Sequence, residues 1–425
     1  MSYTNAYRRV AIIGANRIPF ARHNTNYTNA SNQDMMVAAL NGLIERYKLQ
    51  GQLLGEVAGG AVLKHTREFN LMRESVLGTT LDPRTPACDL QQACDTGVES
   101  AIYIANKIAL GQIECGIAGG VDSSSDVPLV FGEKLRKTLL AARRAKTTGE
   151  RIKLFLSIRL KDWAPVPPLN VEPRTGMSMG DHTEVTAKYF GIAREDQDAF
   201  ALVSHQKMAA AYERGFFKDL MTPYAGLERD NNLRTDSTLE KLAKLKPAFD
   251  KVNGTLTAGN SSPLTDGASC VLLASEDWAK EHNLPILAYI THAEVAAIEF
   301  VKDKQNLLMS PTYAMGRMLD KAGMKFQDFD FYEVHEAFAA QVLAQLKIWE
   351  SEELSGKYGV KAIGAIDRSK LNVNGSSLAA GHPFAATGGR VLATLAKLLN
   401  EKGSGKGVIS VCAAGGQSVT MILEK

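Results

Sequence analysis

The chain has 425 residues, of which 45% are hydrophobic and 22% charged, and its 49 Lys and Arg residues nearly balance 46 Asp and Glu residues. This is the composition of an ordinary soluble globular protein of roughly two or three packed units, and a net charge of +3 gives no sign of a nucleic-acid partner. Five cysteines without a Cys-x-x-Cys pair, and eight histidines without metal-ligand spacing, argue against a disulfide scaffold and a metal site.

Short apolar runs alternate with helix-like segments in the first third of the chain. Residues 9–14 and 115–121 are apolar runs of the length of a buried strand, whereas residues 32–47 and 98–110 have helical spacing. This alternation predicts a layered α/β fold. The N-terminal stretch holds only a short apolar run and no cleavage-site pattern, so we expect neither a signal peptide nor a membrane span there. We therefore expect a cytoplasmic protein.

The middle of the chain has a different texture. Residues 131–247 are charged, punctuated by proline and mostly helical, with the clearest amphipathic helix at 195–215. They predict an inserted, mainly helical unit. The α/β texture then returns: a glycine-rich turn feeds a helix at 372–399, and 408–416 resembles 115–121 as a strand with two glycines. The sequence therefore predicts two similar α/β halves.

The stretch DLQQACDTG contains the first candidate for chemistry, Cys94, just before the apolar face of the 98–110 helix. A cysteine at the N-terminal entry of a helix meets free N–H groups and the positive end of the helix dipole, which favour the thiolate. Two considerations oppose this interpretation. A cysteine in apolar surroundings is commonly buried and inert, and the negative charge of Asp95 would raise the pKa of the thiol.

Three further residues have the setting of a functional site. His382 lies in NGSSLAAGHPFAATGG, where glycines let the backbone approach a ligand closely. His335 follows an apolar strand, where α/β folds keep their active sites. Cys412 leaves a strand into small residues. Each residue also has a purely structural explanation: a solvated turn histidine for His382, a helix-capping histidine for His335 and a packed turn for Cys412.

Taken together, these residues match one family in kind, order and spacing. The chain resembles the thiolases (acetyl-CoA acyltransferases), and within them the 3-ketoacyl-CoA thiolases of fatty-acid β-oxidation, including the thiolase subunits of trifunctional complexes. The resemblance runs almost from end to end. Its most specific pieces are AGGVDSSSDVP, MGDHTE, LKPAFD, AGNSSPLTDGAS, VHEAFAAQ, GHPFAATGGR and CAAGGQ.

The resemblance implies the thiolase fold, in which two similar βαβαβαββ halves form a layered α-β-α-β-α core. It implies an N-terminal half at 1–277, interrupted by an inserted loop domain at about 126–250, and a C-terminal half at 278–425. It also implies coenzyme A and acyl-CoA as substrates, no cofactor and no metal, and a homodimer or homotetramer. A hydratase/dehydrogenase partner subunit stays open.

The resemblance also assigns roles to the four candidates. Cys94 aligns with the nucleophile that takes the acyl group, and His382 with the histidine that deprotonates it. Cys412 aligns with the second cysteine, which acts as general acid and base. His335 stands in a His-Glu-Ala-Phe motif, where many thiolases have Asn-Glu-Ala-Phe and the trifunctional type has histidine.

Further matches are weaker, and the sequence also departs from the family pattern. Arg234 and Ser262 align with residues that contact the nucleotide and the pantetheine arm of CoA. The backbone N–H groups of Cys94 and Ala414 are expected to form an oxyanion hole. Ala414 replaces a glycine there, so we expect a negative φ at this residue. The acidic Asp95 beside the nucleophile is unusual for the family.

The implied activity is the thiolytic release of acetyl-CoA from a 3-ketoacyl-CoA. One alternative is a biosynthetic acetoacetyl-CoA thiolase, since the same residues can join two acetyl-CoA molecules in a Claisen condensation. A ketosynthase of the same superfamily would lack Cys412. A non-catalytic lipid carrier is a further alternative, but degenerate members of that kind should have lost Cys94, His382 or Cys412.

One charged segment is not needed for this chemistry. Residues 134–161 carry ten basic residues and one acidic residue, interleaved with leucine, isoleucine and phenylalanine and followed by Trp163. Such a pattern suits a segment that lies on an anionic membrane surface, so we expect a protein peripheral to a membrane. The alternatives are a solvated helical hairpin that shapes the CoA entrance and a docking face for an acidic partner subunit.

Overall fold

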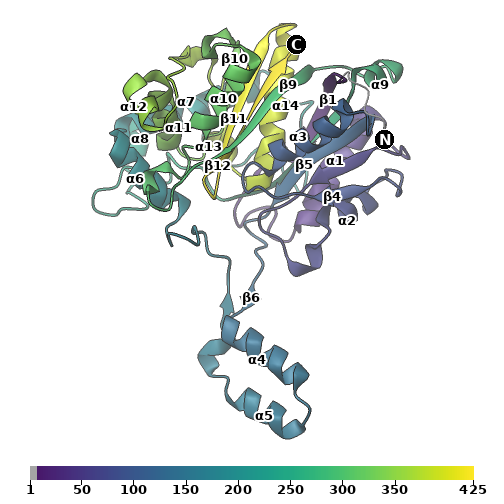
Figure 1. Ribbon diagram of the computed structural model, residues 1–425, viewed down its shortest axis with the longest axis vertical. Helices are drawn as coiled ribbons and strands as arrows, with labels where there is room; N and C mark the ends of the chain where they lie inside the picture. The colour runs from purple at the N-terminus through teal and green to yellow at the C-terminus, as the bar shows by residue number, and fades with distance from the viewer. Residues whose placement is uncertain (1–6) are drawn as a thin grey trace.

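The computed structural model describes residues 7–425, with a layered α/β body from which a pair of helices projects on a thin stalk (Figure 1). The strands are β1 (Val10–Arg17), β2 (Ala21–Arg22), β3 (Glu56–Gly59), β4 (Ala87–Asp89), β5 (Cys115–Asp122), β6 (Val130–Phe131), β7 (Pro165–Val166), β8 (Thr265–Ser275), β9 (Ala288–Ala297), β10 (Phe331–Val334), β11 (Lys406–Ala413) and β12 (Gln417–Glu424). The α-helices are α1 (Asn32–Tyr47), α2 (Leu71–Leu77), α3 (Thr96–Ala109), α4 (Glu133–Arg144), α5 (Thr148–Leu156), α6 (Met179–Phe190), α7 (Arg194–Glu213), α8 (Leu239–Ala243), α9 (Glu276–Glu281), α10 (Pro311–Ala322), α11 (Ala339–Glu350), α12 (Glu352–Lys357), α13 (Ser377–Ala380) and α14 (Thr387–Lys402).

The two halves of the chain repeat one pattern of strand pairing. In the first half the strands lie in the order β4-β3-β5-β8-β1; β4, β3 and β5 are parallel, and β8 is antiparallel to β5 and β1. In the second half the order is β10-β11-β12-β9, with β10 parallel to β11 and β12 antiparallel to both neighbours. A parallel bridge between Tyr332 and Leu371 lies where β4 lies in the first half. The predicted similarity of the halves is therefore present in the fold.

The halves are joined edge to edge through their first strands. Val10, Ala11 and Ile12 of β1 pair antiparallel with Ile290, Tyr289 and Ala288 of β9. Within residues 7–425 the strands of the two halves consequently form one ten-stranded sheet, and β6 and β7 form a separate pair. Without this short pairing, β1 and β9 would be edge strands that expose unpaired backbone N–H and C=O groups.

The layers follow from the alternation of side chains along the buried strands. In β1, Val10 and Ile12 face a core that also holds the apolar faces of α3 and α14, whereas Ala11 and Ile13 face α1 and α2. In the second half, β11 and β12 also contribute to the core around α14, while α10 and α11 cover the opposite face. Helices α3 and α14 therefore form a central layer between the halves, as the predicted α-β-α-β-α arrangement requires.

The N-termini of α3 and α14 approach each other closely because both contain glycine. A Cβ atom at Gly388 would lie 2.3 Å from the backbone nitrogen of Val98 and 2.7 Å from the Cα atom of Gly97. Backbone atoms cannot yield to such a contact as a flexible side chain would. Cys94 precedes α3 and His382 precedes α14, so this close approach brings the two candidates together.

The inserted segment divides into two parts. The paired strands β6 and β7 carry α4 and α5 away from the body (Figure 1). Helices α6 and α7 instead pack on the body, where both contact α11. The boundaries of the insert at about 126–250, and of the halves at 277 and 278, stay predictions. Among the described residues, no helix is both long enough and apolar enough to span a membrane.

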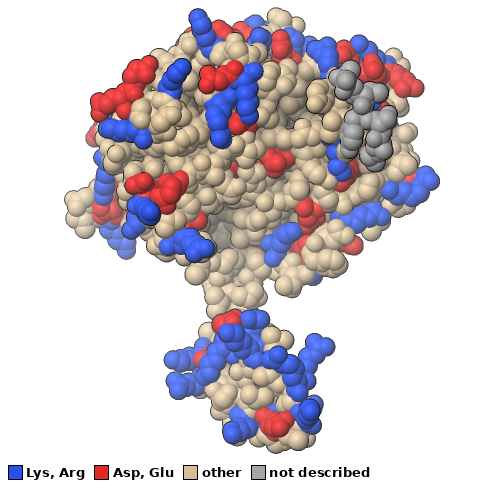
Figure 2. All heavy atoms as spheres, in the orientation of Figure 1, with Lys and Arg blue, Asp and Glu red and all other residues tan. Residues whose placement is uncertain are grey.

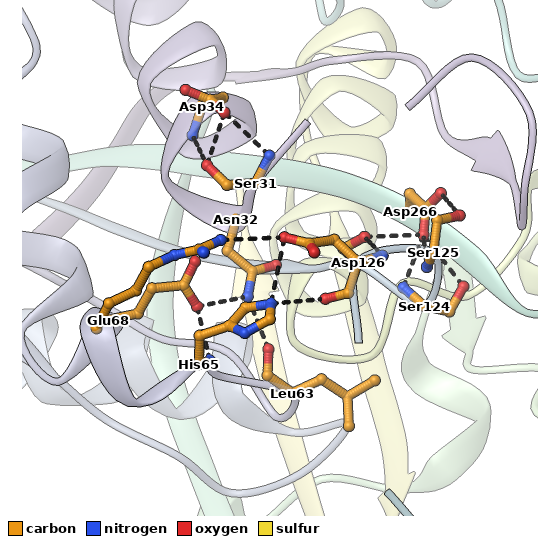
Figure 3. Close-up of polar contacts among 12 residues, drawn as sticks. Ser31, Asn32, Asp34, Leu63, His65, Glu68, Ser124, Ser125, Asp126 and Asp266 are labelled. Atoms are coloured by element: carbon orange, nitrogen blue, oxygen red, sulfur yellow. Dashed lines mark hydrogen bonds and ion pairs between the residues drawn. The ribbon is translucent and has the colours of Figure 1, made fainter. Parts of the chain in front are cut away.

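Polar contacts anchor the segment that leads from β5 into the stalk (Figure 3). Asp266 of β8 accepts hydrogen bonds from the backbone N–H groups of Ser124 (2.7 Å) and Ser125 (3.0 Å). The carboxylate of Asp126 lies 3.3 Å from the Nε2 atom of His65. The AGGVDSSSDVP motif therefore fixes the base of the projecting hairpin to the sheet.

The close contact of the two helices gives a testable prediction. Gly388→Ala should lower the free energy of unfolding by about 1–3 kcal/mol, because the added methyl group overpacks backbone against backbone. Urea unfolding followed by circular dichroism measures this change. Gly316→Ala in α10 is the matched control: a Cβ atom there meets no heavy atom within 4 Å, so it should be neutral or stabilise by up to about 1 kcal/mol. Equal urea midpoints of unfolding for Gly388→Ala and Gly316→Ala would contradict the close contact between α3 and α14.

Candidate active site

Cys94 lies in a tight turn between β4 and α3. Ala93 has a φ of 47°, in the left-handed region that residues with a Cβ atom rarely adopt. The hydroxyl of Thr96 holds this turn: it donates to the carbonyl of Ala93 (2.7 Å) and accepts from the backbone N–H of Gln92 (2.9 Å). Because the turn ends directly at α3, Cys94 is placed at the N-terminal entry of that helix, as the sequence predicts.

The imidazole of His382 lies against Cys94. Its Nε2 atom is 3.1 Å from the Cys94 sulfur, although the two residues are 288 positions apart. Its Nδ1 atom is 2.6 Å from the hydroxyl of Thr387, the first residue of α14. The backbone N–H of His382 donates to the Thr265 hydroxyl at 3.2 Å. Held in this way, the ring can donate its Nδ1–H to Thr387 and accept the thiol proton at Nε2.

The loop after His382 is tied to the first half by Asp122, at the end of β5. One carboxylate oxygen accepts from the backbone N–H of Ala385 at 2.9 Å, and the other accepts from Val62 and Leu63 at 2.9 and 2.8 Å. Three backbone donors thus meet one buried carboxyl group. Asp122 therefore links the histidine loop to the strand-end loop of the N-terminal half.

Cys412 and Ala414 complete the surroundings of the Cys94 sulfur. Cys412 is buried at the end of β11. Burial and the nearby Cys94 both raise its pKa well above the usual value of a thiol. A hydrogen bond from the Ala414 backbone reaches Cys94. Ala414 is not among the described residues with positive φ, so its N–H can take the place of a glycine donor.

His335 lies in the loop between β10 and α11, and its ring centroid is 4.2 Å from that of His382. Its Nδ1 atom is 2.8 Å from the hydroxyl of Ser377. Its Nε2 atom is buried and has no hydrogen-bond partner among residues 7–425. The alternative of a helix-capping histidine is wrong, because α11 begins only at Ala339 and its N-cap residue is Phe338. The structure thus brings all four candidates, Cys94, His335, His382 and Cys412, into one cluster.

Cys94 and His382 form a neutral pair. Burial, followed by the charge of Asp95, raises the pKa of Cys94 to about 12, and the Ala414 hydrogen bond only partly opposes this. Burial, followed by the positive charge of Arg390, lowers the pKa of His382 to about 3. The expectation that the helix N-terminus favours a thiolate at Cys94 is therefore wrong, because desolvation outweighs the helix dipole.

Asp95 is fully buried beside the nucleophile. Burial, followed by the charge of Glu99, raises its pKa well above the usual value of a carboxyl group. The charge of Asp95 comes second only to burial among the causes that raise the pKa of Cys94, so the effect expected of this acidic neighbour is present in the structure.

Arg234 lies on a cavity of about 250 Å³ that reaches from α8 toward the active site. The same cavity is lined by Ser261 and Pro263 on either side of Ser262, and by Leu378 next to the His335 partner. The backbone N–H of Ser262 donates to the carbonyl of Ala337 at 3.0 Å. Arg234 thus lines this cavity, and Ser262 lies in the chain between two of its lining residues, while their role in binding CoA stays a prediction.

Comparison with known proteins decides the family. Residues 10–277 match the family described as thiolase, N-terminal domain, and residues 284–425 match thiolase, C-terminal domain. The chain belongs to the thiolase family. A 3-ketoacyl-CoA thiolase of Yersinia pestis (strain Pestoides F) is 42% identical over an alignment of 424 residues, which covers 98% of this chain and 97% of that protein.

Solved structures agree with this assignment. An acetyl-CoA acetyltransferase of Bacillus anthracis is 30% identical, with a TM-score of 0.83 over 99% of this chain and all of that one. The human mitochondrial 3-ketoacyl-CoA thiolase in complex with CoA is 29% identical, with a TM-score of 0.79 over 98% of both chains. The predicted thiolase fold is therefore confirmed over nearly the whole length.

The thiolase site includes residues that sequence reasoning missed. Thr387 and Thr265 hold His382, and Ser377 and Arg390 stand behind His335. Thr387 carried a signal, since it lies five residues after His382 in a glycine-rich stretch. The other three lie in the quoted motifs AGNSSPLTDGAS (Thr265), NGSSLAAGHPFAATGG (Ser377) and GHPFAATGGR (Arg390), but their contacts with the two histidines become visible only in the fold.

Proposed function

We propose that this thiolase cleaves 3-ketoacyl-CoA, transfers the shortened acyl group to CoA and releases acetyl-CoA, as in fatty-acid β-oxidation. The 3.1 Å contact between the Cys94 sulfur and His382 Nε2, with Cys412 and His335 in the same cluster, carries this proposal. A thiol beside a neutral imidazole is a nucleophile with its base in place. The degree of identity to a 3-ketoacyl-CoA thiolase supports this substrate class.

In the first half-reaction, His382 takes the proton of Cys94 as the sulfur attacks the 3-keto carbon of the substrate. The oxyanion that forms on this carbon accepts hydrogen bonds from the backbone N–H groups of Cys94 and Ala414, and each such donor contributes about 3–4 kcal/mol elsewhere. The bond between C2 and C3 then breaks. The acyl group stays on Cys94. The electron pair of the broken bond leaves with the acetyl-CoA fragment, which becomes an enolate.

The departing enolate needs a proton and a stabilised oxygen. His335 and His382 face the position of the thioester oxygen and donate to it, while the Cys412 thiol gives its proton to C2 and acetyl-CoA leaves. In the second half-reaction, the Cys412 thiolate takes the proton of the incoming CoA thiol. The CoA sulfur attacks the acyl group, and Cys94 regains its proton from His382. Atoms and protons balance over the cycle.

The same residues could run the reaction backward and condense two acetyl-CoA molecules. We propose thiolysis over condensation because the relative that is 42% identical is named a 3-ketoacyl-CoA thiolase. A non-catalytic lipid carrier fits poorly, since it would not need a paired thiol and imidazole. The cavity at Arg234 and Ser262 is the proposed entry of CoA. The homodimer or homotetramer, and a hydratase/dehydrogenase partner, stay predictions.

The proposed reaction is tested by following thiolysis of acetoacetyl-CoA and of a long-chain 3-ketoacyl-CoA in a spectrophotometer. The wild-type protein should cleave both, and their ratio gives the chain-length preference. Cys94→Ser should lower turnover by about 10³-fold or more, because it removes the nucleophile. Cys412→Ser should still be acylated but turn over slowly. Cys88→Ser, which changes a cysteine outside the cluster, should stay close to wild type. Wild-type turnover in Cys94→Ser would contradict the assignment.

We further propose that the projecting hairpin places this otherwise cytoplasmic enzyme on an anionic membrane surface. Figure 2 shows Lys and Arg side chains surrounding the projecting lobe. Ion pairs with Glu133 and Asp162 neutralise some of the cations near the stalk. The cations that have no ion pair among the described residues are Arg143, Arg144, Lys146, Arg151, Lys153, Arg159 and Lys161.

The apolar side chains of the hairpin support a lipid surface over a solvated one. No residue of α5 is buried. Leu156 is 81% exposed, Leu160 93% and Trp163 54%, and they lie in the same segment as the unpaired cations. Basic and exposed apolar side chains together are the combination that an interfacial segment uses, since lipid headgroups meet the charges and the acyl boundary meets the apolar groups.

Vesicle binding tests this second proposal. The protein should cosediment with vesicles that contain phosphatidylglycerol or cardiolipin, and added salt should weaken the binding. Reversing Arg143, Arg144 and Lys146 to Glu should release the protein while thiolysis of acetoacetyl-CoA continues. The control reverses the exposed Lys302, Lys325 and Lys361, which changes the net charge equally but elsewhere on the surface. No binding at low salt, or equal loss in both triple variants, would overturn the proposal.

A further inference from the structure

A buried polar chain that the proposed mechanism does not use stands behind His335. Arg390 of α14 is 2% exposed. Its Nη2 atom donates to the hydroxyl of Ser377 at 2.7 Å, and its Nη1 atom donates to the hydroxyl of Ser376 at 3.0 Å. The Ser377 hydroxyl in turn lies 2.8 Å from Nδ1 of His335. The guanidinium, one hydroxyl and the imidazole thus form a line that ends at the active site.

The direction of these hydrogen bonds follows from what each group can do. A guanidinium only donates, so the Ser377 oxygen must accept from Arg390. The hydroxyl proton of Ser377 then needs an acceptor, and His335 Nδ1 is the one that the structure offers among residues 7–425. If Nδ1 carried the proton instead, Ser377 would accept twice and its own proton would be buried without a partner. These hydrogen bonds therefore favour a His335 ring whose Nδ1 atom carries no proton.

Burial and the neighbouring groups also determine the charge of the His335 ring. Burial, followed by His382 and by the positive charge of Arg390, lowers the pKa of His335 well below its usual value, so the ring stays neutral. The carboxyl group of Glu333 lies 4.0 Å from Arg390. Burial raises the pKa of Glu333 to about 8 and lowers the pKa of Arg390. The carboxylate of Glu336 is occupied by Ser204, by Asn372 and by the backbone of Leu378, and no hydrogen bond joins it to the imidazole.

We propose that Arg390 and Ser377 are positioning residues that hold His335 in the tautomer with its proton on Nε2. A neutral imidazole with a bare Nδ1 must carry its proton on Nε2, which is the buried nitrogen that has no hydrogen-bond partner in the described part of the chain. That nitrogen then presents a donor to the thioester oxygen of the substrate. The opposite tautomer would present a lone pair and repel this oxygen. The inference rests on the proposed thiolase activity, because the oxygen belongs to the proposed substrate.

The proposal predicts a defect in one step only. The thioester oxygen gains charge when the bond between C2 and C3 breaks, and His335 acts there. Exchange of the acetyl group between acetyl-CoA and labelled CoA forms no enolate, and its oxyanion lies in the hole of Cys94 and Ala414. Loss of the Ser377 hydroxyl should therefore slow cleavage of acetoacetyl-CoA by about 10- to 100-fold, while acetyl exchange stays within about twofold of wild type.

The experiment measures both rates in the full-length wild-type enzyme and in three variants. Ser377→Ala should lower the ratio of cleavage to exchange, and Ser377→Thr, which retains a hydroxyl, should restore it. Ser376→Ala is the matched control, since it removes the other acceptor of Arg390 and leaves the His335 partner in place; its ratio should stay near wild type. Wild-type enzyme without any cleavage would defeat the proposed function, whereas an unchanged ratio in Ser377→Ala would defeat only the present inference.

A spectroscopic measurement keeps the proposal testable even if a variant folds poorly. In the wild-type enzyme labelled with ¹⁵N-histidine, long-range proton–nitrogen spectra identify the protonated nitrogen of each ring. The resonances of His335 are those that disappear in His335→Asn. A protonated Nε2 with a bare Nδ1 is the expected result, and Ser377→Ala should mix the two tautomers. A protonated Nδ1 in the wild-type enzyme would overturn the proposal.

Discussion

The contact between the Cys94 thiol and the His382 imidazole joins the two halves of the chain, and the rest of the site is arranged around it. Cys94 precedes α3 of the first half and His382 precedes α14 of the second, so their meeting depends on how closely these helices pack. Glycine at 97 and 388 permits backbone to lie against backbone at that point. Asp122 then ties the histidine loop to the opposite half. The central layer is thus both the packing core of the fold and the frame of its chemistry.

Burial of this contact determines the protonation states of Cys94 and His382 before substrate binds. Desolvation raises the pKa of Cys94 to about 12 and lowers that of His382 to about 3, so a neutral thiol lies beside a neutral imidazole. The same exclusion of water strengthens each hydrogen bond that the site directs at a developing negative charge. A buried site of this kind holds a weakly reactive thiol at rest. It becomes reactive when substrate supplies an oxygen to which the charge can move.

Patterns within single segments predicted much of this structure. The helix expected at 32–47 is α1 (Asn32–Tyr47), and Cys94 lies at the entry of α3, because apolar periodicity and local turns decide both. The motifs also identified the four residues that cluster. Features that need two distant segments were not predictable. The glycine contact and the pKa of Cys94 arise only when the two halves pack together. The hydrogen bonds that join Arg390, Ser377 and His335 arise when three segments of the C-terminal half meet, and the division of the insert likewise appears only in the fold.

The pH dependence of alkylation at Cys94 tests most directly whether the two halves hold a neutral pair. Only the thiolate reacts, so the rate with iodoacetamide follows the fraction of thiolate. Because the pKa of Cys94 is raised to about 12, the rate should rise about tenfold per pH unit from pH ~6 to ~9 without a plateau. Mass analysis of the Cys94 peptide separates it from the other half-buried cysteine, Cys88. A plateau below pH ~8 would show a preformed thiolate and imidazolium, and would contradict the account.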